Sequence, residues 1–133
     1  MRYTALLLIA LLPACAMGPQ VSQAELDAVT LVAEPAGGDT IRLTLTNGSM
    51  QSVGYNLCAS ALQRREGSVW MPVESDVVCT LELRTLAPSE STTYDQTIPD
   101  GGLEPGVYRY TTSIEIPLGT PQRPLVTPSF RIG

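Results

Sequence analysis

Hydrophobic and polar side chains alternate along most of the chain after about residue 25. The clearest case is residues 40–47, where Ile41, Leu43 and Leu45 fall on one side of an extended chain and Arg42 and Thr44 on the other. A period of two is typical of a β-strand with one buried and one solvated face. The pattern therefore predicts a strand at 40–47 that turns its aliphatic side chains into a core.

The same alternation recurs to the end of the chain, interrupted by turn residues at 47–49, 64–67, 87–89 and 99–106. The segments on either side of the 64–67 turn predict a hairpin, and prolines at 121, 124 and 128 favour an edge position for the last strand. No segment after the N-terminal region has a helical period. The predicted strands cover residues 29–31, 40–47, 53–63, 68–73, 77–85, 92–98, 107–116 and 125–132. Such a series predicts an all-β chain folded as an antiparallel β-sandwich of seven to eight strands.

One turn has a more specific pattern. In residues 103–108, Tyr108 follows closely on Pro105 and Gly106. This spacing is typical of a tyrosine corner, in which the tyrosine hydroxyl bonds to a backbone group upstream. The alternative is an ordinary turn followed by a core tyrosine.

The N-terminal residues have the order of a secretory signal: Arg2, an apolar run over residues 5–12, Pro13, and small residues around Cys15. The apolar run is about half of the ~20 residues that span a bilayer. Residues 12–15, Leu-Pro-Ala-Cys, resemble the bacterial lipoprotein box, although Pro13 departs from the usual residue. The resemblance implies cleavage before Cys15 and lipid on its thiol. The alternative is a signal for soluble export, cut near Ala14 or Ala16.

These features predict three regions: a lipoprotein signal peptide at 1–14, a lipidated cysteine and tether at 15–25, and a sandwich domain at 26–133. Ala16 stands where an aspartate commonly signals retention in the inner membrane. We therefore expect an exported protein of the cell envelope, held in the outer membrane and facing the periplasm.

The chain has three cysteines and no histidine. If Cys15 carries lipid, Cys58 and Cys79 remain as a pair in an oxidising compartment, which predicts a disulfide. A metal site is not expected, because two thiolates without histidine lack further ligands.

Charge and composition argue against several functions. The net charge is −5, and all eight basic residues are arginines, which argues against nucleic acid and against electrostatic binding to anionic lipid. Without histidine or lysine, a nucleophilic enzyme lacks an obvious base.

Two chemical alternatives remain open. One is a carboxylate active site among Glu82, Glu90, Asp95 and Glu115, and the other is a partial calcium site at 74–76 or 100–102. We expect neither an enzyme nor a cofactor, since carboxylates on a surface are ordinarily solvated.

Two further surface features have alternative interpretations. Arg64 and Arg65 could form an anion-binding patch, although Glu66 beside them favours a solvated hairpin tip. Trp70 and Tyr110 could form an exposed aromatic platform for a sugar or peptide, although packing in the core is the simpler expectation.

The order of several short motifs resembles a family of bacterial immunoglobulin-like domains found in exported proteins and lipoproteins. The motifs are LTLTN, NLC, a tryptophan followed by Pro-Val, a second cysteine, LAPSES and LEPGVYRY, within residues 29–116. The resemblance implies an immunoglobulin-like antiparallel β-sandwich and structural roles for Asn47, Trp70, Gly106, Tyr108 and Arg109. The family has no shared activity. A more distant likeness is to small bacterial proteinase-inhibitor domains.

Two functions follow as hypotheses. The first is a non-catalytic, lipid-anchored envelope protein that binds or scaffolds another envelope component through loops or an exposed strand edge. Its partners would be the membrane, through lipid on Cys15, and a protein of the envelope. The alternative is a proteinase inhibitor that presents a loop such as residues 99–105 to its target.

Overall fold

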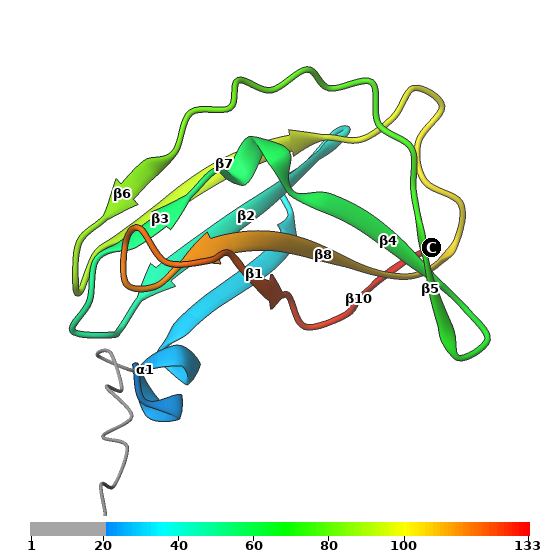
Figure 1. Ribbon diagram of the computed structural model, residues 1–133. Helices are drawn as coiled ribbons and strands as arrows, with labels where there is room; N and C mark the ends of the chain where they lie inside the picture. Colours follow the sequence, from blue (N-terminus) through cyan, green and yellow to red (C-terminus); the bar gives the residue numbers. More distant parts are fainter. Residues whose placement is uncertain (1–20) are drawn as a thin grey trace, which may run out of the picture.

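A computed structural model describes residues 21–133; the expected signal peptide and Cys15 lie outside the described residues. The described chain is an immunoglobulin-like β-sandwich of two antiparallel sheets (Figure 1). The alternation predicts the antiparallel sandwich, and the family resemblance implies its immunoglobulin-like form. Alternating side chains of the two sheets face each other across a common core.

The smaller sheet has the order β1-β2-β7. Its strands are β1 (Val29–Pro35), β2 (Thr40–Asn47) and β7 (Ser91–Thr97). The central strand β2 pairs along its whole length with both neighbours, so that Leu43 lies opposite Ala33 on one side and Tyr94 on the other. The predicted strand at 40–47 is confirmed.

The larger sheet is built around β8 (Gly106–Glu115), the longest strand. Along one edge of β8 lie β4 (Ala61–Glu66) and then β3 (Val53–Tyr55), with β5 (Val69–Pro72) beyond β4 and β6 (Arg84–Leu86) beyond β3. Along the other edge lie β10 (Phe130–Ile132) and β9 (Arg123–Val126). The β4–β5 hairpin that the sequence predicts is present, with Gly67 in the left-handed conformation at its tip.

The core lies between the sheets and is formed by alternate residues of the long strands. Ile41, Leu43 and Leu45 of β2 are completely buried, and Tyr108 and Tyr110 of β8 face them with exposed fractions of 1% and 3%. Fully burying such a side chain contributes about 1.5–3 kcal/mol relative to leaving it exposed. The hydrophobic periodicity is therefore the main determinant of this fold.

Three sequence predictions differ from the structure in their boundaries. Residues 53–63 do not form one strand: the 3₁₀ helix η1 (Leu57–Ala59) separates β3 from β4, although both pair with β8. The last strand is likewise two short strands, β9 and β10. A short helix, α1 (Gln23–Asp27), capped by the Ser22 hydroxyl, begins inside the segment expected to be a tether.

The prediction of a strand over residues 77–85 is wrong for most of its length. Only β6, at the end of this segment, pairs with a neighbour, and that neighbour is the three-residue strand β3. Because the chain turns into η1 after Tyr55 and Asn56, no further backbone of this sheet is available to residues 77–83. Alternation alone could not reveal the missing partner. Residues 73–83, called the strap below, instead run without regular structure across the top of the view in Figure 1.

Candidate binding site between the strap and strand β7

Strand β7 is an edge strand of the smaller sheet: one of its edges pairs with β2, and the other is unpaired in the described chain. The amide of Ile98 donates to Asp39 O at 2.7 Å, and the amide of Asn47 donates to Glu90 O at 2.9 Å. Both bonds involve an even-numbered residue of this segment, and in an antiparallel pair the pattern repeats every two residues. The backbone N–H and C=O groups of the even-numbered residues 90–98 therefore point toward β2. Those of residues 91, 93, 95 and 97 therefore face the open edge.

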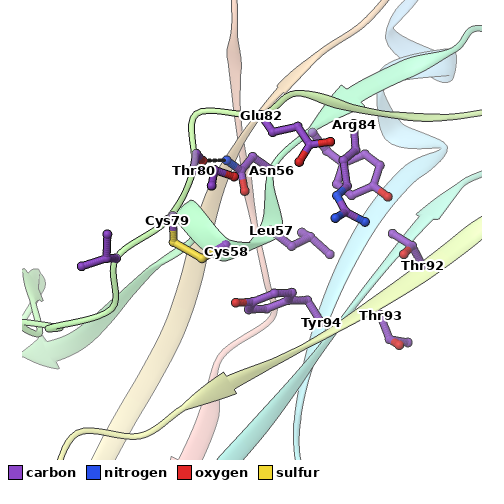
Figure 2. Close-up of a pocket in the computed structure, with 12 residues that line it drawn as sticks. Asn56, Leu57, Cys58, Cys79, Thr80, Glu82, Arg84, Thr92, Thr93 and Tyr94 are labelled. Atoms are coloured by element: carbon purple, nitrogen blue, oxygen red, sulfur yellow. Dashed lines mark hydrogen bonds between the residues drawn. A yellow bond between two sulfur atoms is a disulfide. The ribbon is translucent and has the colours of Figure 1, made fainter.

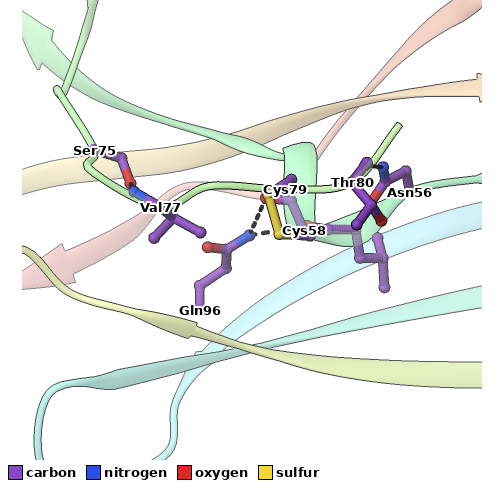
Figure 3. The surroundings of a disulfide bond; sticks show 8 residues. Asn56, Cys58, Ser75, Val77, Cys79, Thr80 and Gln96 are labelled. Carbon is purple, nitrogen blue, oxygen red and sulfur yellow. Dashed lines mark hydrogen bonds between the residues drawn. A yellow bond between two sulfur atoms is a disulfide. The ribbon is translucent and has the colours of Figure 1, made fainter. Parts of the chain in front are cut away.

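The strap is fastened at two adjacent points to the segment that joins β3 and β4. Cys79 forms a disulfide with Cys58 of η1, with their Cα atoms 5.8 Å apart. One residue further on, the side-chain amide of Asn56 donates to Thr80 O at 2.7 Å. The disulfide confirms the expected cysteine pairing, and Figure 3 shows both attachments side by side. The strap is thus held in place although it belongs to neither sheet.

A pocket of about 410 Å³ lies between the strap and β7. Thr92, Thr93 and Tyr94 of β7 line one side, while Glu82 of the strap lines the other (Figure 2). Val78 of the strap also lines the pocket. Its remaining lining includes η1, the disulfide and Arg84. The pocket, called the slot below, therefore runs beside an unpaired strand edge and has both apolar and charged groups around it.

Gln96 of β7 holds two residues of the slot lining, Leu57 and Cys58, through their backbone. It is 4% exposed, and its side-chain nitrogen donates to Leu57 O at 2.8 Å and Cys58 O at 3.2 Å (Figure 3). One side chain of β7 thereby fixes the position of η1, which carries the disulfide. The sequence pattern had placed Gln96 in a strand but gave no sign of this role.

The strap exposes apolar side chains to solvent. Val78 and Leu81 are 94% and 101% exposed, although both are large and aliphatic. Val78 lines the slot, whereas Leu81 lies with Leu83 at a neighbouring pocket over β8. Val78 is therefore the exposed apolar side chain that the strap offers at the slot.

Asn47 and Tyr108, to which the family resemblance gives structural roles, lie in separate parts of the sandwich. Asn47 is fully buried; its Nδ2 donates to Gln51 O and Leu86 O, and its Oδ1 accepts from the backbone and hydroxyl of Ser49. Asn47 thus ties the end of β2 to the other sheet. At the opposite turn, the Tyr108 hydroxyl donates to Glu104 O at 2.6 Å, which is the contact of a tyrosine corner.

Gly106 lies beside Arg64, and a Cβ atom at this position would be 3.0 Å from Arg64 Nε. Glycine leaves room for the arginine to reach Glu104 Oε2 at 2.9 Å and Pro105 O at 3.2 Å. Arg64 is therefore engaged with this turn and not with an anion patch shared with Arg65.

The other two residues given structural roles, Trp70 and Arg109, are in contact. The Arg109 guanidinium carbon lies 4.3 Å from the centre of the Trp70 ring, and Arg109 Nε donates to Gln63 Oε1 at 2.7 Å. Tyr110 is buried on the opposite side of the sheet, so Trp70 and Tyr110 do not form a shared platform.

Of the four carboxylates considered for catalysis, Glu82 and Glu115 line one pocket, whereas Glu90 and Asp95 do not line it. Asp95 forms a two-pronged ion pair with Arg42, at 2.8 and 3.0 Å, and the guanidinium lowers the pKa of this exposed carboxyl. Glu90 accepts from the Ala87 amide and Glu115 from the Gly119 amide, while Glu82 lies at the slot.

The two segments considered for calcium approach one another, since Asp76 and Asp100 line one pocket. Within residues 21–133, however, no group of three or more histidine, cysteine, aspartate or glutamate side chains is arranged to hold a metal ion.

Comparison of the chain with protein-family models, curated proteins and solved structures found no match. Among the described residues, no helix has both the length and the apolar character needed to cross a bilayer.

Proposed function

We propose that this chain is a non-catalytic, lipid-anchored protein of the cell envelope, which binds an extended segment of a partner protein in the slot. The anchor rests on the lipoprotein-like residues 12–15. The disulfide supports an oxidising compartment, because such bonds persist outside the reducing cytosol. In this account Cys15 is the first mature residue, and the outer membrane, facing the periplasm, is the location.

The observation that carries the binding function is the open edge of β7 beside a fixed strap. An unpaired strand edge presents a row of backbone donors and acceptors that can pair with an extended peptide. Residues 91, 93, 95 and 97 supply that row, and Val78 supplies an apolar contact across the slot. An added strand would extend the smaller sheet and cover part of the strap.

The position of the site fits a protein held at its N-terminus. In Figure 1 the strap crosses the top of the sandwich, whereas α1, the first described element, lies near the bottom. A membrane anchor upstream of α1 would therefore leave the slot directed away from the lipid. Partner recognition would then occur on the side of the domain that faces the compartment.

A photoreactive amino acid at Thr93, in protein expressed in its own host, tests this proposal. We expect it to cross-link one partner, whereas the same group at Thr30, on the outer face of β1, does not.

Thr93→Pro removes a backbone donor that faces the open edge without removing a β2–β7 bond, and Thr93→Val is the matched control that keeps the donor. In each variant the photoreactive group is placed at position 95. We expect cross-linking to the partner to be lost in the proline variant and kept in the valine variant. Equal cross-linking in both variants would contradict pairing at this edge.

The alternative function is proteinase inhibition by the loop at 99–105. One end of this loop is held by Tyr108 and Arg64, as an inhibitory loop requires. Its tip, however, contains Gly101 and Gly102, both with positive φ, which offer no side chain to a specificity pocket. Assay of the purified protein against serine, cysteine and metalloproteinases at micromolar concentration separates the two functions, since the edge-binding account predicts no inhibition.

A further inference from the structure

A second surface lies on the outer face of the larger sheet, remote from the slot in the pairing order. The register places Trp70, Arg65, Val107 and Arg131 in one row across β5, β4, β8 and β10. Leu62, Tyr108 and Phe130 lie an odd number of positions from Arg65, Val107 and Arg131 on the same strands. They belong to the core or pack against it, so alternation turns the row toward solvent. Arg109 extends the patch from the next row by lying against Trp70. We call Arg65, Trp70, Arg109 and Arg131 the arginine face.

The arginine face concentrates positive charge on an acidic protein. The chain has thirteen acidic and eight basic residues, yet the ion pairs of the described residues are Arg42–Asp95 and Arg64–Glu104, neither of which lies on this face. Glu66 is next to Arg65 in sequence but follows the opposite alternation of β4. Three guanidinium groups are therefore gathered on one face without a carboxylate partner among residues 21–133.

Part of this face is fixed before any ligand arrives. Arg109 stacks on Trp70 and donates through Nε to Gln63, so its position is set from two directions. The guanidinium carbon of Arg65 lies 6.0 Å from the centre of the same ring, while Arg65 and Arg131 are exposed. Arginine binds carboxylates through paired N–H donors, and fixing the group beforehand reduces the entropy lost on binding.

The chemistry of the arginine face favours one kind of ligand. Sugar stacking needs an open aromatic face, whereas the guanidinium of Arg109 lies 4.3 Å from the Trp70 ring. Insertion into lipid needs protruding apolar side chains, whereas Trp70 and Val107 of the row are both half-buried. A surface formed by arginine and tryptophan is instead typical of the centre of protein interfaces.

We propose that the arginine face is a docking surface for a carboxylate-rich segment of a protein. Arg65 and Arg131 would bind carboxylates directly, and Arg109, held by Trp70 and Gln63, would supply a third, fixed site. This surface is independent of the slot, because it lies on the other sheet and uses side chains where the slot uses a strand edge.

Trp70 is the only tryptophan of the chain, so its fluorescence reports directly on this face. The full-length protein in neutral detergent is titrated with a deca-glutamate peptide at low salt, and the emission of Trp70 is followed. We expect saturable binding that weakens as NaCl is added. Arg65→Gln and Arg131→Gln should each weaken binding about two- to fivefold, the range expected for an exposed ion pair. Arg123→Gln, an exposed arginine of β9 outside the face, is the matched control and should leave binding unchanged.

Three results would overturn the proposal. The first is an unchanged Trp70 emission at all peptide concentrations. The second is an equal loss of affinity in the Arg123 and Arg131 variants, which would indicate attraction without a site. The third is a response to mixed micelles containing phosphatidylglycerol and not to the peptide, which would make the face a membrane contact. Because Thr93 is not part of this surface, Thr93→Pro should bind the peptide as the unmodified protein does.

Discussion

Gln96 of the smaller sheet donates to the carbonyl oxygens of both Leu57 and Cys58 of η1, at 2.8 and 3.2 Å. This buried contact holds η1 against β7 and so fixes the width of the slot. The disulfide then fastens the strap to the same short helix. Gln96 is therefore a positioning residue for the candidate binding site, although it offers nothing directly to a ligand.

Replacing Gln96 with methionine tests this role, because methionine has a similar length but cannot donate. We expect Gln96→Met to lower the free energy of unfolding by about 1–3 kcal/mol, since it leaves the Leu57 carbonyl buried without its donor. Urea unfolding provides the measurement. The matched control is Thr93→Val in the same strand, which is exposed and should change stability by less than about 0.5 kcal/mol. Equal stability of the methionine variant and the unmodified protein would contradict the bridging role.

The disulfide closes a loop with a sequence separation of 21. On the loop-entropy estimate, the double variant Cys58→Ala/Cys79→Ala should be about 3 kcal/mol less stable than the oxidised protein. A thiol reductant should lower the urea midpoint of the unmodified protein toward that of the variant and leave the variant itself unchanged. If the reductant lowered the urea midpoint of both proteins equally, its effect would not come from the Cys58–Cys79 disulfide.

The hydroxyl of Tyr108 contributes through its bond to Glu104 O. Removing it in Tyr108→Phe should cost about 1 kcal/mol, because the ring remains packed while the hydrogen bond is lost. Tyr94→Phe is the matched control: Tyr94 is only partly buried, and its hydroxyl has no hydrogen bond within residues 21–133. Thermal unfolding of the two variants should separate them, and equal losses would argue against the corner contact.

Tyr110 gives the protein a defined response to alkaline pH. Burial raises the pKa of Tyr110 to about 12, above the usual value of about 10. The folded chain therefore retains a proton that the unfolded chain loses, so stability falls between about pH 10 and 12, by about 2–3 kcal/mol in all. Below about pH 10 this residue has no effect on the pH dependence. Tyr110→Phe should show a smaller fall over that range, and absorbance titration should lose its latest phenol transition. A fall of undiminished size in the variant would assign the effect to other groups.

The sequence pattern predicted the architecture well because most strands have one buried and one solvated face. Ile41, Leu43 and Leu45 are the clearest example, and the disulfide followed from the number of cysteines and the expected compartment. The strap was mistaken for a strand because alternation reports which side chains are apolar and says nothing about whether a partner edge exists. Val78 and Leu81 satisfy the pattern while remaining exposed.

The candidate sites could be predicted only in part. The notion of an exposed strand edge came from the sequence, but the edge of β7 and the slot depend on which strands pair across long separations. The same holds for the arginine face, where Arg65 and Arg131 share a row because β4 and β10 pair with opposite edges of β8. Nothing in the local sequence around either arginine indicates the other.

The proposed function makes this domain a disulfide-closed lipoprotein of the envelope. The most direct test is the intact mass of the protein extracted from its native membrane, recorded with and without reductant. The account predicts a chain of residues 15–133 that carries diacylglyceryl and acyl groups at Cys15, and a mass increase on reduction equal to the two hydrogens taken up by Cys58 and Cys79. A chain without acyl groups that begins after Cys15 would contradict the anchor and make this a freely secreted domain.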